Sequence, residues 1–128
     1  PRVYGEGTDL LLISYANGLY CSLRVARRLE QQHGIRARVM DLRWLNPLPS
    51  DALFEHANTC GATLVVDECR RTGGVSEGVY TALIDAGYRG PLARVAAHDT
   101  FIPLGPAADH VLVQEPDIEA AAIRLLGR

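Results

Sequence analysis

The sequence predicts an α/β fold with three layers, in which helices cover both faces of a mostly parallel sheet. Short apolar stretches alternate along the chain with longer segments whose apolar residues recur every three or four positions. The first stretch, Asp9–Tyr15, contains a continuous apolar run, as expected of a strand buried on both faces. Strands that alternate with helices pair in parallel, because each helix returns the chain to the starting edge of the sheet.

The first half of the chain is predicted to form strand, helix, strand and helix in that order. Asn17-Gly18 ends the first strand and opens a helix to about Gln32, and Gly34 suits the C-terminal end of that helix. A second strand with partial alternation follows, and a proline-containing connection then leads to a helix capped by Ser50. The predicted ranges of these two elements are Ile35–Leu42 and Ser50–Thr59.

The second half is predicted to form strand, helix, two strands and a last helix, which makes five strands and four helices in all. Glu115-Pro116-Asp117 begins the last helix, with proline at its first position and acidic residues in its first turn. Ala97–Asp109 has two prolines and Gly105, and it is predicted to be a structured loop that could serve as a binding surface. The other predicted ranges are Ala62–Val66, Val75–Ala86, Leu92–Ala96 and His110–Val113.

Composition narrows the classes of function. The 128 residues suit one domain with a single core, and the net charge of −2 gives no reason to expect nucleic acid or an anionic membrane. No apolar run approaches the roughly 20 residues that span a bilayer. The three cysteines form no CxxC pair, which fits a reducing cytoplasm. All thirteen basic residues are arginine, so chemistry that requires a lysine is excluded.

The segment Asp67–Gly78 is the densest cluster of charge and glycine in the chain. An apolar strand leads here into charged residues, then Gly73-Gly74, then the start of a helix. Open α/β sheets place their functional groups at such carboxyl ends of strands. The glycines could approach a phosphate, which Asp67 and Glu68 would repel, although Arg70 and Arg71 could offset the repulsion. Relief of backbone strain and close helix packing are the favoured interpretation of the glycines.

The charged residues of this segment favour ion pairing over acid–base catalysis. Asp67 and Glu68 are adjacent on a strand, so their side chains point to opposite faces and do not converge on one substrate atom. Salt bridges with Arg70, Arg71 or another subunit are therefore expected.

Other catalytic patterns are weak or absent. The four histidines have no HxH or HxxxH spacing, and neither GxGxxG nor GxSxG occurs. His98-Asp99 is the one histidine–acid pair with a conceivable functional role, and its alternative is a loop held by local hydrogen bonds. Trp44 is expected to anchor the connection between a strand and a helix.

Four segments, taken in order, form a specific pattern: DLLLISYANGLYCSLRVARRLE (9–30), RVMDLRWLNPLP (38–49), LVVDECRRTGGVSEGV (64–79) and HDTFIPLGPAADHVL (98–112). Its most specific part is the combination of a DLRxLxPL strand exit with a DExxxxGG turn. Together these segments resemble the C-terminal domain of transketolase-type enzymes. The chain is most similar to the β subunit of the 2-oxo acid dehydrogenase decarboxylating component, of the pyruvate or branched-chain type.

This resemblance implies a Rossmann-like α/β/α sandwich with a mixed five-stranded sheet whose first strand is antiparallel. It also implies a parent enzyme that uses thiamine diphosphate and Mg²⁺ to decarboxylate a 2-oxo acid and passes the acyl group to a lipoyl group. The family's cofactor motif, GDG followed by paired asparagines, does not occur in this sequence, and neither does the pyrimidine-binding domain. Residues 1–128 are therefore expected to be one domain of a longer chain, without bound cofactor and without decarboxylase activity by itself.

The resemblance further implies a role in assembly. The expected partners are the remaining domains of the β subunit, the α subunit, the peripheral subunit-binding domain of the lipoyl acyltransferase, and a second copy in a homo-oligomer. Glu68, Arg70 and Arg71 are expected to form interface ion pairs, and His98-Asp99 to lie near a neighbouring subunit. The glycines expected to allow close helix approach are Gly73, Gly74 and Gly78.

Two alternatives remain open. One is a free-standing, flavodoxin-like module that binds a small ligand or a nucleotide. The other is a purely structural dimerisation domain recruited to an unrelated protein.

Overall fold

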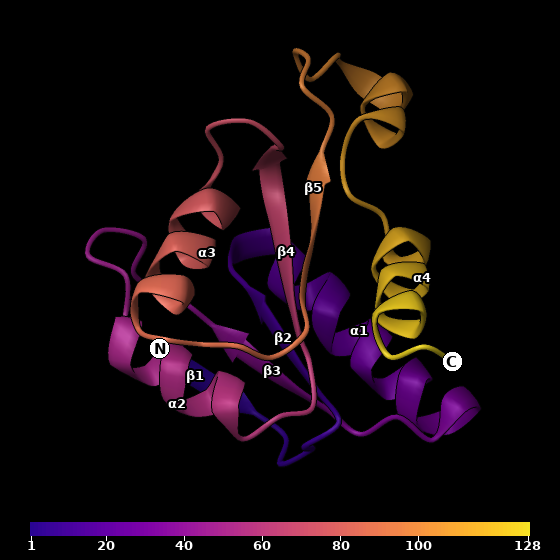
Figure 1. Ribbon diagram of the computed structural model, residues 1–128. Coiled ribbons are helices and arrows are strands. Elements are labelled where there is room, and N and C mark those ends of the chain that lie inside the picture. The colour runs from indigo at the N-terminus through magenta and orange to yellow at the C-terminus, as the bar shows by residue number, and fades with distance from the viewer.

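A five-stranded mixed sheet forms the centre of the computed structural model, which describes residues 1–128. The strand order is β1-β3-β2-β4-β5; β1 pairs antiparallel with β3, and all other pairs are parallel. Figure 1 shows β4 and β5 running side by side toward the loops at the top of the molecule. The strands are β1 (Arg2–Tyr4), β2 (Leu10–Ser14), β3 (Ala37–Asp41), β4 (Thr63–Arg70) and β5 (Leu92–Ala97).

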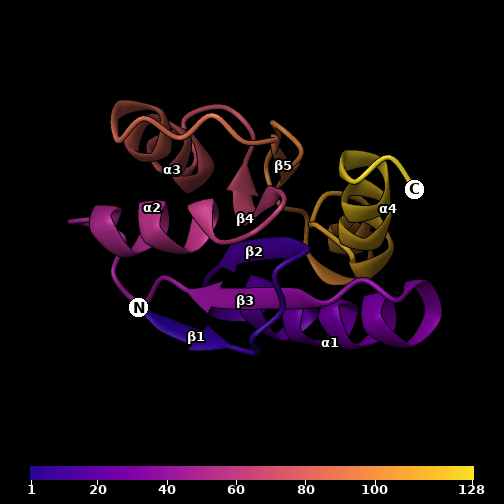
Figure 2. The ribbon, with the colours of Figure 1, turned by 60° about the horizontal axis from the view of Figure 1, so that its bottom comes forward.

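Helices cover both faces of this sheet, as the sequence predicts. Helices α1 and α4 pack on one face, and α2 and α3 pack on the other (Figure 2). The helices are α1 (Ala16–His33), α2 (Ser50–Asn58), α3 (Val75–Asp85) and α4 (Glu115–Leu125), and a short 3₁₀ helix, η1 (Gly105–His110), precedes α4.

The apolar run of β2 explains why helices pack on both faces of the sheet. Leu10 and Leu12 belong to the core beneath α1 and α4, whereas Leu11 and Ile13 belong to the core beneath α2 and α3. All four side chains are fully buried. Since successive side chains of a strand point to opposite faces, an unbroken apolar run requires packing on both sides.

The strand predicted at His110–Val113 is wrong. The backbone N–H groups of Val111 and Leu112 both donate to the carbonyl of Ala108 (2.9 Å each), so the chain turns here instead of extending. Val113 still packs against the core beneath α1 and α4, which is why the segment is as apolar as a strand.

The sheet still has five strands, because β1 takes the place of the strand that was wrongly predicted. The residue pattern did not reveal β1. Its three residues pair with β3 and place Val3 opposite Met40. The antiparallel first strand implied by the resemblance is thereby confirmed, but it is β1 and not the segment Asp9–Tyr15, whose strand β2 pairs in parallel with β3 and β4.

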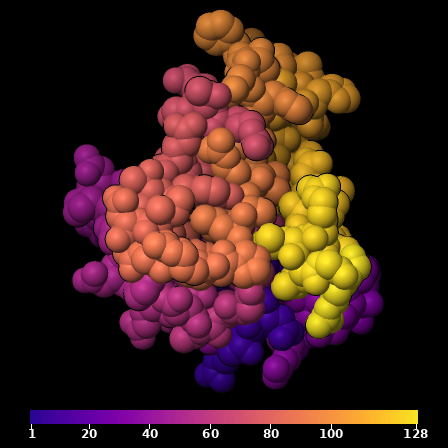
Figure 3. All heavy atoms as spheres, in the orientation of Figure 1, coloured from indigo at the N-terminus to yellow at the C-terminus, as the bar shows by residue number.

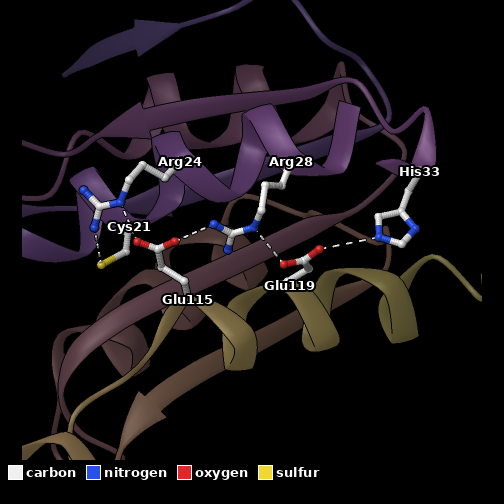
Figure 4. A network of polar contacts seen from close by, with 6 residues as sticks. All are labelled: Cys21, Arg24, Arg28, His33, Glu115 and Glu119. Carbon is white, nitrogen blue, oxygen red and sulfur yellow. Dashed lines mark hydrogen bonds and ion pairs between the residues drawn. The ribbon is translucent and has the colours of Figure 1, made fainter. Parts of the chain in front are cut away.

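Ion pairs join α1 to α4 along their exposed sides (Figure 4). Glu115 pairs with Arg24 and, at 2.6 Å, with Arg28. Glu119 pairs with Arg28 at 3.0 Å and lies 3.5 Å from His33 Nε2. The two helices are thus tied by charge as well as by their shared core, although they are far apart in the sequence.

Candidate functional site

The loops that follow β2, β3, β4 and β5 gather at the carboxyl edge of the sheet. The chain leaves β2 toward α1 on one face and leaves β4 toward α3 on the other, although β2 and β4 are neighbours. Such a reversal opens a crevice between two strand ends, which is where open α/β sheets bind ligands and partners. The segment Asp67–Gly78 lies at this reversal.

Asp67 is the fully buried centre of the edge. Its Oδ1 accepts hydrogen bonds from the hydroxyl of Tyr15 (2.6 Å) and the backbone N–H of Cys69 (2.9 Å). Its Oδ2 accepts one from the backbone N–H of Ser76 (2.6 Å). One carboxylate therefore fastens the end of β2, the end of β4 and the first turn of α3. The expected salt bridge from Asp67 to an arginine is wrong, because its partners within the chain are uncharged donors.

Burial raises the pKa of Tyr15 far above its ordinary value, and the hydrogen bond to Asp67 acts in the same direction. The phenol therefore stays protonated at physiological pH and remains the donor in this contact. Ser14, the residue before it, donates from its hydroxyl to the carbonyl of Val66 (2.8 Å) and links the same two strands.

A bulge in β4 brings the charged residues to the surface. Asp67 pairs with Ala96 and Arg70 pairs with the next residue, Ala97, so two extra residues lie on β4 between these pairs. Glu68 is half-buried, and Arg70 and Arg71 are exposed. None of the three takes part in an ion pair within the chain. Their charges are free to meet another molecule, and their interface role stays a prediction.

The turn itself requires its glycines. Gly73 has φ +69°, a left-handed conformation that side chains rarely adopt. A Cβ on Gly74 would lie 2.8 Å from Asp67 Oδ2 and would clash with the carbonyl of Arg70. A Cβ on Gly78 would make an ordinary contact with Leu48 (3.4 Å to Cδ1). Gly73 and Gly74 thus serve the turn within the chain, and close helix approach at Gly73, Gly74 and Gly78 in an interface stays a prediction.

Asp99 fixes the turn from the neighbouring loop. Its two oxygens accept from the backbone N–H (2.8 Å) and the hydroxyl (2.6 Å) of Thr72. The hydrogen bond from the Thr72 side chain is the main cause that lowers the pKa of Asp99. The backbone N–H of His98 instead donates to the carbonyl of Val111 (3.2 Å), and the residue lines a cleft. Asp99 therefore fits the reading of a loop held by local hydrogen bonds.

A cleft of about 770 Å³ lies between the start of α1, the end of β4 and the loop after β5. It brings together residues from three predicted segments, among them Asn17, Glu68, Arg70 and His98. Two free cysteines, Cys21 and Cys69, also line it. The chain has no group of three His, Cys, Asp or Glu side chains that could hold a metal ion.

Exposed apolar side chains surround this edge, and several lie in the segment Ala97–Asp109 that was predicted as a possible binding surface, although the sequence analysis did not single them out. Phe101 and Leu104 are each 96% exposed, and Trp44 is 69% exposed, so the expected anchoring role of Trp44 is wrong. Figure 3 shows the 98–110 segment projecting beyond the rest of the molecule. The available signal was FIPL inside a loop that contains two prolines, where apolar residues have no sheet to face. The others here are Tyr20, Leu45 and Ile102.

These features define a Rossmann-like α/β domain whose carboxyl edge carries unpaired charges and exposed apolar side chains. None of its helices is long and apolar enough to cross a membrane. The chain belongs to the family of the transketolase C-terminal domain, whose family model matches residues 2–121.

Relatives of the chain include β subunits of 2-oxo acid dehydrogenases and a 1-deoxy-D-xylulose-5-phosphate synthase of Gloeobacter violaceus. The chain is 34% identical over 124 residues to the pyruvate dehydrogenase E1 component subunit beta of Bacillus subtilis (strain 168), which covers 94% of this chain and 38% of that one. It is 33% identical over 129 residues to the 2-oxoisovalerate dehydrogenase subunit beta of the same organism, with the same two shares. The chain thus spans less than two fifths of the length of these relatives.

Solved structures agree with the fold. A split-gene transketolase, described as an inactive beta4 tetramer, aligns with a TM-score of 0.84 and 27% identity over 98% of this chain and 41% of that chain. A 2-oxoglutarate:ferredoxin oxidoreductase from Magnetococcus marinus aligns with a TM-score of 0.70 over 98% of this chain and 19% of that chain, and its 17% identity supports the fold alone.

Proposed function

We propose that the chain is the C-terminal assembly domain of the β subunit of a thiamine diphosphate-dependent 2-oxo acid dehydrogenase. The observation that carries this proposal is the likeness, over 94% of the chain, to the β subunits of pyruvate and 2-oxoisovalerate dehydrogenases. The parent enzyme would decarboxylate a 2-oxo acid and transfer the acyl group to a lipoyl group. The domain would be inactive in isolation and would work in the cytoplasm, where its three free cysteines stay reduced.

The residues of this chain do not fit a site for thiamine diphosphate and Mg²⁺. Mg²⁺ prefers several oxygen ligands in a nearly octahedral arrangement, and Glu68 is the only carboxylate that lines the main cleft. We therefore assign the cofactor and the metal to other parts of the parent enzyme, and we derive no catalytic step from this domain.

The exposed edge supports assembly. Protein interfaces have an apolar centre with aromatic side chains and arginine, surrounded by polar groups. Here the exposed Phe101 lines the same cleft as Arg70, and neither Arg70 nor the adjacent Arg71 forms an ion pair within the chain. Exposed apolar groups gathered on one face are characteristic of interaction sites. The partners would be the other domains of the β subunit, the α subunit, the peripheral subunit-binding domain of the acyltransferase, and a second β subunit.

Charge reversal tests the assembly role. In a complete β subunit that contains this domain, co-expressed with its α subunit, Arg70→Glu and Arg71→Glu should each shift the assembled enzyme toward smaller species. Light scattering coupled to size-exclusion chromatography measures the change. Arg124→Glu is the matched control, because Arg124 is exposed on α4, away from this edge. Assembly that both charge reversals leave unchanged would rule out the arginine contacts.

The main cleft supports a second candidate function, the binding of a small ligand or a nucleotide. A hollow of about 770 Å³ at the reversal between β2 and β4 is where a small-ligand or nucleotide-binding module would bind its ligand. Titration of the isolated chain with nucleotides and with thiamine diphosphate separates the two functions, since saturable micromolar binding in this cleft, lined by Asn17 and Glu68, would favour the module. A gene that encodes a pyrimidine-binding domain upstream of Pro1 would favour the β subunit over a recruited dimerisation domain.

A further inference from the structure

A second hollow, of about 690 Å³, lies between α3 and β5 and shares no residue with the main cleft. Arginine and hydroxyl side chains dominate its lining. β5 is the last strand of the sheet, so this hollow opens at the lateral edge of the molecule. Its lining residues are Arg71, Glu77, Tyr80, Thr81, Ala93 and Arg94.

Arg94 is held in place by α3. Its Nη1 donates to the hydroxyl of Ser76 (3.3 Å), and its guanidinium lies 5.7 Å from the centre of the Tyr80 ring. The side chain is only 20% exposed. Its one anionic neighbour is Glu77, whose Oε1 is 3.7 Å from Nη1 and whose side chain is 47% exposed. The guanidinium is therefore preorganised, but its charge is compensated only by a distant and half-exposed carboxylate.

Arg71 and Tyr80 complete the polar lining. Arg71 is exposed and has no ion pair within the chain. Burial raises the pKa of Tyr80, whereas Arg94 and Arg71 both act to lower it, so both guanidiniums lie within electrostatic reach of the phenol. The hydroxyl stays protonated at neutral pH and can donate a hydrogen bond.

We propose that this hollow binds the phosphate group of a small phosphate monoester, with Arg94 and Arg71 as charged donors and Tyr80 as a hydroxyl donor. Arg71 and Arg94 each carry one positive charge and Glu77 carries one negative charge, so the lining of the hollow has a net charge of about +1. The planar fork of arginine matches the spacing of phosphate oxygens, and a charge near −2 balances both arginines better than a single carboxylate does. This site is independent of the proposed assembly role. Arg71, Tyr80 and Arg94 all belong to this chain, so phosphate binding requires no other subunit.

The test is a titration of the isolated 128-residue chain with inorganic phosphate, glycerol 3-phosphate and acetate. The chemical shifts of the arginine Nε–H signals, recorded by NMR at each step, measure the binding. The phosphate ester should bind most tightly and acetate most weakly. Arg94→Gln and Arg71→Gln should each weaken the binding of the ester about tenfold. Arg27→Gln removes the same charge from an exposed position on α1 and should leave the affinity unchanged.

Glu77→Gln provides a test in the opposite direction. Because Glu77 competes for Arg94, its neutralisation should tighten binding about threefold to tenfold, whereas Glu55→Gln on α2 should not. Arg71 is exposed, so Arg71→Gln keeps the test valid even where Arg94→Gln disturbs the packing on Tyr80. No saturable shift with either phosphate compound, equal affinity for acetate, or an equal effect of Arg27→Gln would each overturn the site. Tighter binding of inorganic phosphate than of the ester would overturn the assignment to a monoester.

Discussion

At the scale of single residues, Asp67 links sequence, fold and interface. Its carboxylate accepts three hydrogen bonds from three different elements while it is fully buried. Buried carboxylates are stable only when hydrogen bonds replace the lost water. The same contacts place the turn that carries Arg70 and Arg71, so the geometry of the candidate interface depends on one side chain that never reaches the surface.

Asp67→Asn should destabilise the domain by about 2 kcal/mol, because the new amide NH₂ replaces one of the two acceptor oxygens and leaves a buried donor facing a donor. Chemical denaturation measures this free energy of unfolding. Asp85→Asn is the matched control, since Asp85 is exposed at the end of α3. An equal effect of the two substitutions would contradict the central role of Asp67.

At the scale of elements, α4 is held to α1 by charge as well as by apolar contact. Arg28 is the main cause that lowers the pKa of Glu115, and Arg24 adds to the effect. A carboxylate with a lowered pKa in the folded state stabilises the fold above its unfolded pKa, and this contribution disappears as the pH falls through the folded value.

Glu115→Gln should therefore lower Tm by roughly 2–4 °C at pH 7, an effect kept small by solvent screening. The difference from the unaltered chain should shrink as the pH falls below about 4, near the ordinary pKa of glutamate. Thermal unfolding followed by circular dichroism over this pH range measures it. Glu55→Gln serves as the control, and a Tm difference for Glu115→Gln that does not vary with pH would refute the ion-pair explanation.

Elements that carry a clear local signal in the sequence were predicted correctly. Elements that depend on partners far away in the chain were missed. The apolar run of β2 and the glycine after α1 were sufficient signals, and Gly34 indeed has φ +64°. β1 has three residues, too few for a pattern, and it exists because β3 offers it hydrogen bonds. At the site, the pairing of Tyr15 with Asp67 spans 52 residues, so no local pattern could have revealed it.

At the scale of the whole molecule, exposed apolar side chains are concentrated at one end. Phe101 and Leu104 lie almost entirely in solvent on a projecting loop (Figure 3). A chain with such a surface tends to associate through it when its natural partners are absent.

The double substitution Phe101→Ser/Leu104→Ser should reduce self-association of the isolated chain without changing its thermal stability, because neither side chain packs against the core. Sedimentation velocity over a range of concentrations measures the change. Ile84→Ser is the control, since Ile84 is 53% exposed but lies on α3. Association that the double substitution leaves intact would place the self-contact elsewhere.

Hydrogen bonds within the chain hold the turn after β4 at its base and at its tip, so the turn is ordered without a partner. Asp67 ties its base to α3, and Asp99 ties its tip to the loop after β5. Fixing a flexible backbone costs about 1–2 kcal/mol per residue, and a segment that is already ordered avoids this penalty at the moment of association. The two aspartates would thus strengthen and speed the docking of another subunit without touching it.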